Sequence, residues 1–242
     1  MKFYSQYKQD KCANILFWGK KNGVFLDIGA NDGISLSNTY FFEKEKKWTG
    51  ICIEPNPKIF KKLQINRDCI LDNCCISGDE RQVTFRIVNG ISNMLSGILD
   101  FFDAEHIARI EQEINVYGGD YEDVPIMCKT IENIVSKYDI TKIDYCSIDT
   151  EGAEFQIIKS IDFDKFSIKS FSVENNNGDK AVRNYLKQKG YYCIPSKTDD
   201  FFIKGFSIKH IPFIIYTTIY FLRWRIRYFL SRLKSKIFGS TK

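Results

Sequence analysis

Apolar residues gather in short continuous runs along the chain, and these runs alternate with segments of mixed polarity. The runs at 24–28, 51–53, 143–148 and 168–173 are typical of strands that are buried on both faces of a parallel sheet. Between several of them, apolar residues recur at helical spacing. Because parallel neighbours need crossover connections, this order predicts an α/β fold with a mostly parallel sheet covered on both faces.

Further elements follow from the same pattern. Helices are expected at 5–20, 35–43, 58–66, 101–114, 151–160 and 179–190, and also after Thr130, which is a typical N-cap residue. More strands are expected at 69–76, 83–87, 124–128, 191–194 and 201–204. The 83–87 segment alternates apolar and polar residues, which indicates an antiparallel or edge strand. Residues 89–97 form a polar, glycine-bounded loop that breaks the pattern.

The turn after the first strand carries the first candidate chemistry. Residues 24–33 read Val-Phe-Leu-Asp-Ile-Gly-Ala-Asn-Asp-Gly, a strand that runs into a glycine turn. Ligands of open α/β sheets bind at such a turn, because glycine lets them approach the backbone and the following helix offers unpaired N–H groups. Gly29 and Gly33 stand four apart, unlike the G-x-G-x-x-G spacing that grips a pyrophosphate. A nicotinamide oxidoreductase is therefore disfavoured.

Carboxylates indicate which ligand this turn suits. Asp27 and Asp32 would repel a pyrophosphate but favour a cationic, phosphate-free ligand such as S-adenosylmethionine. Glu54 ends the second strand, where an acid can accept both ribose hydroxyls, and Asp72 could reach the adenine amino group from the third strand. The alternative is that Asp27 and Glu54 only cap strands in another α/β protein. The predicted cofactor contacts are Asp27, Gly29, Asn31, Asp32, Gly33, Glu54 and Asp72.

Further carboxylates follow the fourth and fifth strands and should meet the cofactor at the same edge of the sheet. Methyl transfer needs an acceptor oxygen in line with the donor and a group that lowers the pKa of that oxygen. Asp149 or Glu151 could serve as general base, and together with Glu174 they are the catalytic candidates. Asp149 could instead cap the next helix, with Glu151 in its first turn.

A divalent metal acting as a Lewis acid is the other possible mechanism. Asp149, Glu174 and Asn175 offer three oxygen ligands of the kind that Mg²⁺ accepts. The set is similar to the acid, acid and Asn ligands of catechol-type O-methyltransferases, although Glu174 replaces an Asp and no Lys follows Asp149. Residues 175–177 could also be only a turn before the 179–190 helix.

Several groups of residues occur in an order that is similar to one known family. They are Ser5-Gln6-Tyr7-Lys8-Gln9-Asp10, the 25–33 loop, Ser37-Asn38-Thr39 with Trp48-Thr49-Gly50 and Ile53-Glu54-Pro55, and the 144–154 segment with Asp149-Thr150-Glu151-Gly152-Ala153-Glu154. In combination, over roughly residues 5–204, they resemble the FkbM-type methyltransferases, a class I S-adenosylmethionine-dependent family.

The resemblance implies a Rossmann-like sheet of seven strands and methyl transfer to a hydroxyl oxygen of a sugar or small molecule. We expect the acceptor to be a sugar, glycan or glycolipid precursor. It also implies that Ser37 and Asn38 hydrogen-bond the amino-acid end of the cofactor. Ser92, Asn93 and Ser96 are candidates to contact the acceptor. The resembling subgroup includes the Star-like proteins, so the alternative is a non-catalytic binding or trafficking protein that keeps the fold.

Composition narrows the class of protein. The chain has 242 residues, of which 44% are hydrophobic and 15% aromatic, enough for one globular domain with a full core. Eight cysteines without a C-x-x-C pair, and only two histidines, argue against a zinc site and favour free thiols in a reducing compartment. No apolar leader follows Met1, so we expect a cytoplasmic protein.

The net charge of +5 is unevenly spread. Residues 1–205 should form the methyltransferase domain, and 206–242 a basic, aromatic, amphipathic tail without an acidic residue. The apolar run at 211–222 is shorter than the ~20 residues that span a bilayer. We expect 206–238 to lie on an anionic membrane surface; packing on the domain or in a partner's groove is the alternative. Nucleic-acid binding is not expected, because the rest of the chain is mildly acidic.

Overall fold

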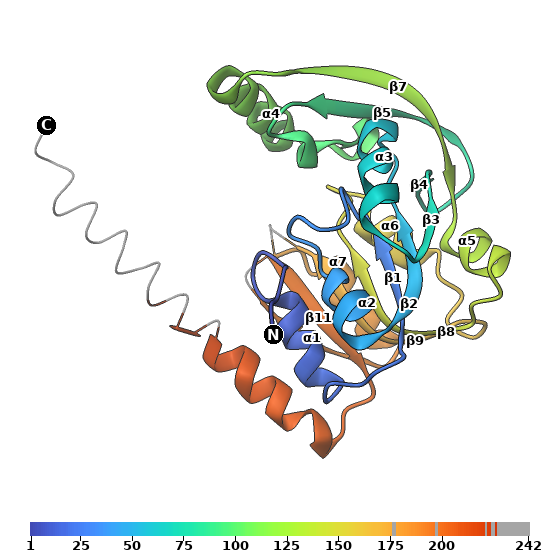
Figure 1. Cartoon of the computed structure of the whole chain (residues 1–242), viewed down its shortest axis with the longest axis vertical. Helices are drawn as coiled ribbons and strands as arrows, with labels where there is room; N and C mark the ends of the chain where they lie inside the picture. Colours follow the sequence, from blue (N-terminus) through green and yellow to red (C-terminus); the bar gives the residue numbers. More distant parts are fainter. Residues whose placement is uncertain (176–177, 197, 221, 224–225, 227–242) are drawn as a thin grey trace, which may run out of the picture.

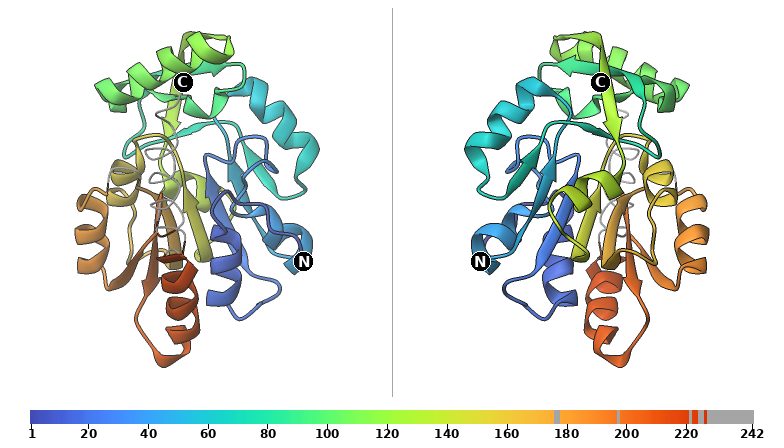
Figure 2. Two further views of the ribbon diagram at one scale, coloured as in Figure 1. Left: turned by 90° about the vertical axis from the view of Figure 1, so that its left-hand side faces the viewer. Right: turned by 90° about the vertical axis from the view of Figure 1, so that its right-hand side faces the viewer.

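The computed structural model describes residues 1–175, 178–196, 198–220, 222–223 and 226. They form a central sheet with helices on both faces, and a smaller sheet lies beyond one end of its strands (Figure 1). The C-terminal helix lies at the opposite end of the molecule from the smaller sheet, as the side views agree (Figure 2).

The central sheet has seven strands in the order β10-β11-β9-β8-β1-β2-β3. Their bounds are β1 Val24–Ile28, β2 Thr49–Ile53, β3 Ile70–Asp72, β8 Lys142–Ile148, β9 Ser167–Glu174, β10 Tyr191–Pro195 and β11 Asp199–Lys204. β11 runs antiparallel to both of its neighbours, and the other pairs are parallel. This confirms the prediction of a Rossmann-like sheet of seven mostly parallel strands.

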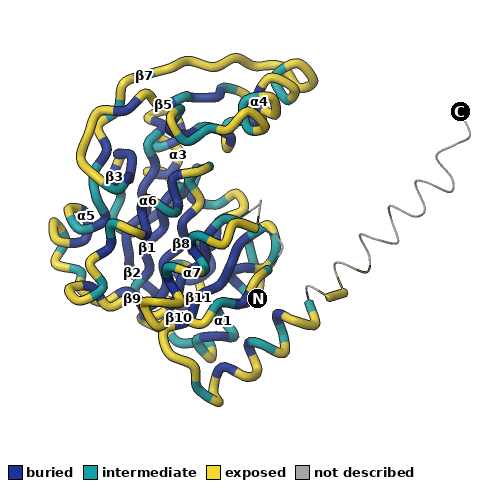
Figure 3. The backbone as a smooth tube through the Cα atoms, turned by 180° about the vertical axis from the view of Figure 1, so that it is seen from behind, coloured by how far each residue is buried: buried dark blue, intermediate teal, exposed yellow. Residues whose placement is uncertain are grey.

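Helices cover the two faces of this sheet because side chains alternate along each strand. Leu26 and Ile28 point into a core shared with one set of helices, α5 Ile131–Lys137, α6 Glu154–Lys159 and α7 Ala181–Gln188. Phe25 points into a core shared with the other set, α1 Gln9–Leu16, α2 Tyr40–Lys46 and α3 Pro57–Asn66. Figure 3 shows the strands buried between these layers.

The smaller sheet has four strands in the order β4-β7-β5-β6. Its elements are β4 Cys75–Ile76, β5 Gln82–Asn89, β6 Gly97–Ile98 and β7 Asp120–Lys129, with the short helices η1 Asn93–Leu95 and η2 Leu99–Phe101 and the longer α4 Ala104–Tyr117. β5 is antiparallel to β6 and β7, as its alternating pattern predicted.

The single strand predicted at 69–76 is wrong. β3 ends at Asp72 in the central sheet, whereas Cys75 pairs with Cys128 in the smaller sheet. Between them, the Asn73 side-chain amide donates to the carbonyls of Glu54 (2.7 Å) and Pro55 (3.1 Å). These bonds hold the chain where it leaves one sheet for the other.

The helix predicted at 35–43 begins only at Tyr40. The Asp32 carboxylate accepts hydrogen bonds from the backbone N–H groups of Ile34 (2.9 Å) and Ser35 (2.7 Å). Such an Asx turn competes with helix formation, and Leu36 then has a φ of +57°, outside the helical region. The segment before α2 is therefore an irregular loop that faces the end of β1.

The chain after β11 returns to α1. The short helix η3 spans Ile208–His210, and residues 211–220 are helical. Phe213 packs in a small core with Leu16 and Phe201. None of the helices among the described residues is long and apolar enough to cross a membrane. The part of the predicted tail at 227–238 lies outside the described residues. All eight cysteines are free thiols, as predicted.

Candidate active site

A cavity of about 580 Å³ lies where the carboxyl ends of the central strands face the smaller sheet. Open α/β sheets bind ligands at this edge, and a typical small-molecule site encloses ~300–1,000 Å³. The N-terminal segment lines one side through Gln6, Tyr7 and Gln9, and α4 lines another through His106 and Arg109. Three parts of the chain that are far apart in sequence therefore share one site.

The loop after β1 and the end of β2 form one wall of the cavity. Gly29 has a φ of +88°, and a Cβ atom there would lie 1.8 Å from the Asp149 carbonyl oxygen. Glu54 accepts the backbone N–H of Asn31 at Oε2 (2.9 Å) and that of Asn56 at Oε1 (2.8 Å). The carboxylate is thereby fixed, and each oxygen keeps a second lone pair for a ligand hydroxyl. Burial raises the pKa of Glu54 to about 7, although the two backbone donors lower it.

Ser37 and Asn38 line the cavity from the loop before α2. Ser37 Oγ accepts from the backbone N–H groups of Thr39 (3.3 Å) and Tyr40 (3.1 Å). Asn38 Nδ2 donates to Ser147 Oγ (3.0 Å), whereas the buried Asn38 Oδ1 has no partner among the described residues. Buried acceptors in folded proteins are normally paired, so this oxygen suits a donor that belongs to a ligand.

Asp27 lies at the base of the same wall and is almost fully buried. Its Oδ2 accepts a hydrogen bond from Thr39 Oγ1 (2.5 Å) and lies 4.0 Å from Arg67 Nη1. Burial raises the pKa of Asp27, and the Arg67 guanidinium opposes that rise. Asp27 thus supports the loop as well as lining the cavity.

The loop after β8 is held in an uncommon conformation. Glu151 has a φ of +56°, which is rare for a residue with a side chain. The Glu154 carboxylate accepts from Thr150 N (2.9 Å), Thr150 Oγ1 (2.8 Å) and Gly152 N (3.1 Å). The helix predicted at 151–160 therefore begins only at Glu154, and Glu151 faces the cavity. Non-glycine residues with such strained backbone cluster at functional sites.

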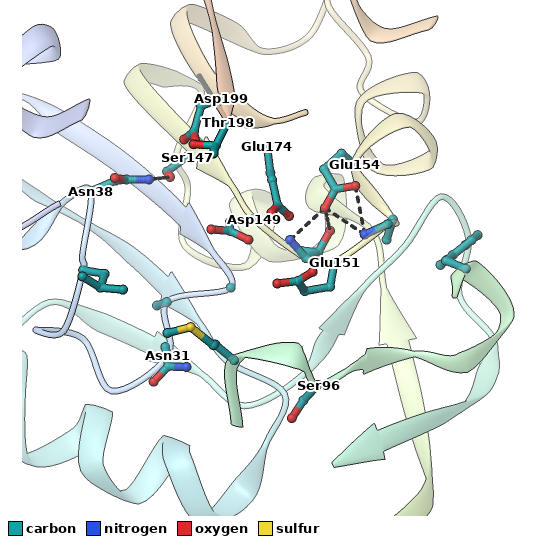
Figure 4. A pocket seen from close by; sticks show the side chains of 18 of the residues that line it. Asn31, Asn38, Ser96, Ser147, Asp149, Glu151, Glu154, Glu174, Thr198 and Asp199 are labelled. Atoms are coloured by element: carbon teal, nitrogen blue, oxygen red, sulfur yellow. Dashed lines mark hydrogen bonds between the residues drawn. The ribbon is translucent and has the colours of Figure 1, made fainter. Parts of the chain in front are cut away.

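Asp149, Glu151 and Glu174 lie together, with one carboxylate oxygen of each within 4.8 Å of the others. Figure 4 shows the three groups facing one another in the cavity. Burial raises the pKa of all three, to about 8 for Glu151 and Glu174 and well above its usual range for Asp149, and mutual repulsion adds to the rise. Protein atoms surround Asp149, yet the residue remains exposed to the open cavity.

The sequence did not single out His106, which approaches this cluster from α4. Its Nδ1 lies 3.5 Å from Glu151 Oε2, and its Nε2 lies 3.0 Å from the Leu95 carbonyl oxygen. A carbonyl only accepts hydrogen bonds, so Nε2 carries a proton and Nδ1 faces Glu151. His106 lies in a helix predicted from its amphipathic pattern, but that pattern gave no sign of which carboxylate it would meet.

Asp199 is a second cavity residue that the sequence analysis did not predict. Its carboxylate lines the cavity and accepts from Gln9 Nε2 (3.1 Å) and Ser172 Oγ (3.0 Å). Burial raises its pKa. Gln9 belongs to the N-terminal motif that contributed to the family resemblance, and this was the available signal that the N-terminus reaches the site.

Three predicted cofactor contacts do not line the cavity: Asp32, Gly33 and Asp72. The Asp32 carboxylate accepts hydrogen bonds within its own turn. A Cβ at Gly33 would lie 2.6 Å from Leu63 Cδ1 of α3, so this glycine allows α3 to pack closely. Asp72 accepts from Lys129 (3.0 Å) and Lys137 (2.8 Å), which lower its pKa to about 2. The structure therefore gives these residues structural roles in place of the predicted contacts.

Asn175 also departs from its predicted role as a metal ligand. Its Nδ2 donates to Asp200 Oδ2 (2.6 Å), and its Oδ1 accepts the backbone N–H of Asp179 (2.7 Å). Glu151 takes its place beside Asp149 and Glu174. Residues 176 and 177 lie outside the described residues. Asn175 itself still lines the cavity. Of the predicted acceptor contacts, Asn93 and Ser96 line the cavity and Ser92 does not. The other predicted site residues all line it, namely Asp27, Gly29, Asn31, Ser37, Asn38, Glu54, Asp149, Glu151 and Glu174.

Comparison with known proteins gives one strong match. A family model described as the methyltransferase FkbM domain matches residues 27–193, more than half of the chain. No curated protein sequence matches.

Some solved structures have a similar fold, at low sequence identity. The methyltransferase FkbM from Methylobacillus flagellatus KT has a TM-score of 0.47 and 13% identity, over 79% of this chain and 47% of that one. TrmK from M. capricolum, in complex with S-adenosyl-homocysteine, has a TM-score of 0.44 and 10% identity, over 83% and 68% of the two chains. The chain thus spans about half the length of the FkbM structure.

The match of the family model to residues 27–193 shows the family, whereas the solved structures have low identity and TM-scores. The matched region runs from the β1 loop through the carboxylate cluster to β10, and so includes most of the cavity wall described above. The chain belongs to the FkbM methyltransferase family.

Proposed function

We propose that the protein transfers a methyl group from S-adenosylmethionine to a hydroxyl oxygen of a sugar, glycan or glycolipid precursor. The observation that carries this proposal is that fixed acidic and amide acceptors and a cluster of three carboxylates line the same cavity. When bound, S-adenosylmethionine supplies an electrophilic methyl group on a sulfonium. Its positive charges suit a cavity whose described walls carry many carboxylates but, of lysines and arginines, only Arg109.

One wall suits the cofactor. Glu54, held by two backbone N–H groups, accepts the ribose hydroxyls with its remaining lone pairs. The unpaired Asn38 Oδ1 accepts a hydrogen bond from the ammonium group, and Ser37 lies beside it. Pro55, Ile59 and Ile76 line the apolar part of the cavity and suit the adenine ring.

The cluster of three carboxylates suits the acceptor. Hydroxyl groups donate hydrogen bonds, and Asp149, Glu151 and Glu174 offer oxygens that accept them. Because their pKa values are raised toward neutrality, one of these groups can take the acceptor's proton at the pH of catalysis. Glu151 is the best placed, since His106 Nδ1 lies 3.5 Å from its carboxylate and can share the proton.

The same three oxygens fit a divalent cation, because hard carboxylate ligands are those that Mg²⁺ prefers. Asp149, Glu151 and Glu174 would hold it, and the ion would act as a Lewis acid on the acceptor oxygen. Treatment with EDTA separates the two mechanisms: a general base predicts unchanged turnover, and a metal predicts loss that Mg²⁺ restores.

Calorimetric titration tests the cofactor. We expect saturable heat with S-adenosylmethionine and S-adenosylhomocysteine and none with NAD. A Glu54→Ala variant, which removes the ribose contact, should weaken binding at least ~10-fold. Absence of heat with both sulfur ligands in the folded protein contradicts the proposal.

A second experiment tests turnover. Methyl-labelled S-adenosylmethionine is incubated with a panel of free sugars, oligosaccharides and glycolipid head groups, and products are analysed by mass spectrometry. We expect O-methylated product with at least one hydroxyl acceptor. Cofactor binding without turnover on any member of the panel would instead favour the non-catalytic, Star-like alternative.

A further inference from the structure

One face of the C-terminal helix is anchored to the body of the protein. Phe213 and Thr217 are almost fully buried, and the Phe213 ring lies 5.6 Å from that of Phe201 in β11. Leu16 of α1 belongs to the same core. This packing fixes which side of residues 211–220 points away from the domain.

The outward side is apolar. Ile211, Ile215 and Ile219 recur every four residues and are each at least 40% exposed, and Leu222 and Ile226 continue the series. Residues at this spacing lie on one side of a helix. The preceding turn adds Phe206 and Ile208, the latter 81% exposed. Soluble monomers seldom leave such a continuous apolar surface uncovered, which indicates an interaction site.

A tryptophan from the N-terminal part of the chain lies next to this surface. Trp18 is 66% exposed, and its indole Nε1 donates to the Lys209 carbonyl oxygen (3.2 Å). Tyr192, also exposed, lies with its ring 5.4 Å from that of Phe206. Trp and Tyr are enriched where proteins meet the boundary between lipid and water, because their rings are apolar and their edges polar.

The same region carries basic residues but no acidic ones. Lys204, Lys209 and Arg223 are exposed among the described residues, and the sequence has nine Lys and Arg but no acidic residue from 204 to 242. An anionic surface complements this charge, whereas a second copy of the chain would bring like charges together. Since none of the described helices can cross a bilayer, the fitting geometry is a helix that lies on the surface.

We propose that this surface, formed by Trp18, Phe206, Ile208, Ile211, Ile215 and Ile219, binds an anionic phospholipid membrane. The isoleucines insert among the upper acyl chains, and the basic residues contact the head groups. The surface lies at the end of the molecule away from α4 and the smaller sheet (Figures 1 and 2). Binding therefore leaves the smaller sheet directed away from the bilayer.

Co-sedimentation of the full chain with vesicles tests this inference. We expect binding to vesicles of phosphatidylcholine with phosphatidylserine, at least ~10-fold weaker binding to phosphatidylcholine alone, and release at about 1 M salt, where the screening length falls to about 3 Å. The double variant Ile215→Asp, Ile219→Asp should lose at least ~10-fold in binding, because it places two charges in the inserted face.

The matched control is the double variant Ile65→Asp, Val116→Asp, which makes the same change at exposed aliphatic residues of α3 and α4. It should bind anionic vesicles like the unaltered protein. Both variants should bind S-adenosylhomocysteine equally well, which shows that they are folded and keeps this test separate from the proposed activity.

Three results would overturn the inference. They are failure of the unaltered chain to bind anionic vesicles, equal loss in both double variants, and a dimer in light scattering that the Ile215→Asp, Ile219→Asp variant alone abolishes. The last result would assign the surface to self-association.

Discussion

At the scale of single residues, the cavity is governed by carboxylates that the fold holds out of bulk water. Asp149, Glu151 and Glu174 come from the ends of two neighbouring strands, and their proximity makes it costly to ionise all of them together. Protons shared within such a cluster belong to the group as a whole. This property suits either proton transfer or capture of a cation.

The variant Asp149→Asn tests the carboxylate cluster. We expect S-adenosylmethionine binding to be retained and turnover to fall at least ~100-fold, because the amide can neither share the proton that Glu151 takes up nor serve as an anionic ligand. The control Asp164→Asn changes an exposed residue outside the cavity and should keep full turnover. Normal turnover of Asp149→Asn would place the chemistry elsewhere.

Site residues could be predicted from the sequence only where a local pattern marked them. Asp27, Gly29 and Glu54 were found because strand ends and glycine turns can be read directly from sequence. Asp72 ends a strand in the same way, but two lysines from the smaller sheet and α5 occupy its carboxylate. That competition is between residues more than fifty positions apart, so no local pattern could reveal it.

At the scale of elements, the site depends on two loops that pass very close to each other. The variant Gly29→Ala would place a Cβ 1.8 Å from the Asp149 carbonyl oxygen at a positive φ, so the β1 and β8 loops must separate. We expect a loss of about 3 kcal/mol or more in the free energy of unfolding, together with loss of cofactor binding.

Gly118→Ala is the control for backbone strain alone. Gly118 also has a positive φ, +76°, but a Cβ there meets nothing within 4 Å. The expected cost is about 1–3 kcal/mol, with cofactor binding retained. Urea denaturation of both variants provides the comparison, and equal costs would show that the loops can separate freely.

A buried arginine joins α3 to α2 and to the β1 strand. Arg67 donates to Glu43 (2.6 Å), to the Gly33 carbonyl oxygen (3.1 Å) and to Thr39 Oγ1 (3.0 Å), and it lies 4.0 Å from Asp27. The variant Arg67→Met removes the guanidinium beside the buried Asp27 and leaves Glu43 with Lys44 (2.9 Å) as its cationic partner. We expect the free energy of unfolding to fall by about 3–5 kcal/mol.

Arg81→Met is the matched control, because the Arg81 side chain is 43% exposed and lies 3.4 Å or more from its acidic partners. Surface pairs of this kind contribute at most about 1 kcal/mol. If urea denaturation shows similar losses for both variants, the Arg67 network is not a main support of the β1 loop.

At the scale of the whole molecule, the ligand-free protein should lose stability as the pH rises from about 4.5 to about 8. Glu54, Glu151 and Glu174 have folded-state pKa values of about 7, about 8 and about 8, against an ordinary value of 4.5. Between these values the folded state binds more protons than the unfolded state, so the free energy of unfolding decreases with pH.

Below about pH 5 the free energy of unfolding should change in the opposite direction, decreasing as the pH falls. Glu43 and Asp72 have pKa values lowered to about 2 by cationic partners, so their contribution is lost as the pH falls below about 4. Thermal denaturation at several pH values should therefore give maximal stability near pH 5. A variant Glu174→Gln should reduce the loss on the alkaline side, and a flat or rising profile from pH 5 to 8 would contradict the raised pKa values.

The sequence by itself determined the layered α/β fold, the order of its strands and helices apart from the division of residues 69–76 into β3 and β4, and the acids at the ends of β1, β2, β8 and β9. Hydrophobic runs, glycine turns and strand ends are local features, and a parallel sheet has few ways to arrange them. Family membership agreed with that pattern, because the motifs fall on those same strand ends.

Only the tertiary structure decided which of those acids face the cavity and what they meet there. The smaller sheet brings His106 to Glu151, the N-terminal segment brings Gln9 to Asp199, and neutralising lysines remove Asp72 from the site. These outcomes depend on contacts between residues distant in the chain, and the free energy of such contacts is set by burial and by competing partners that a local pattern does not contain.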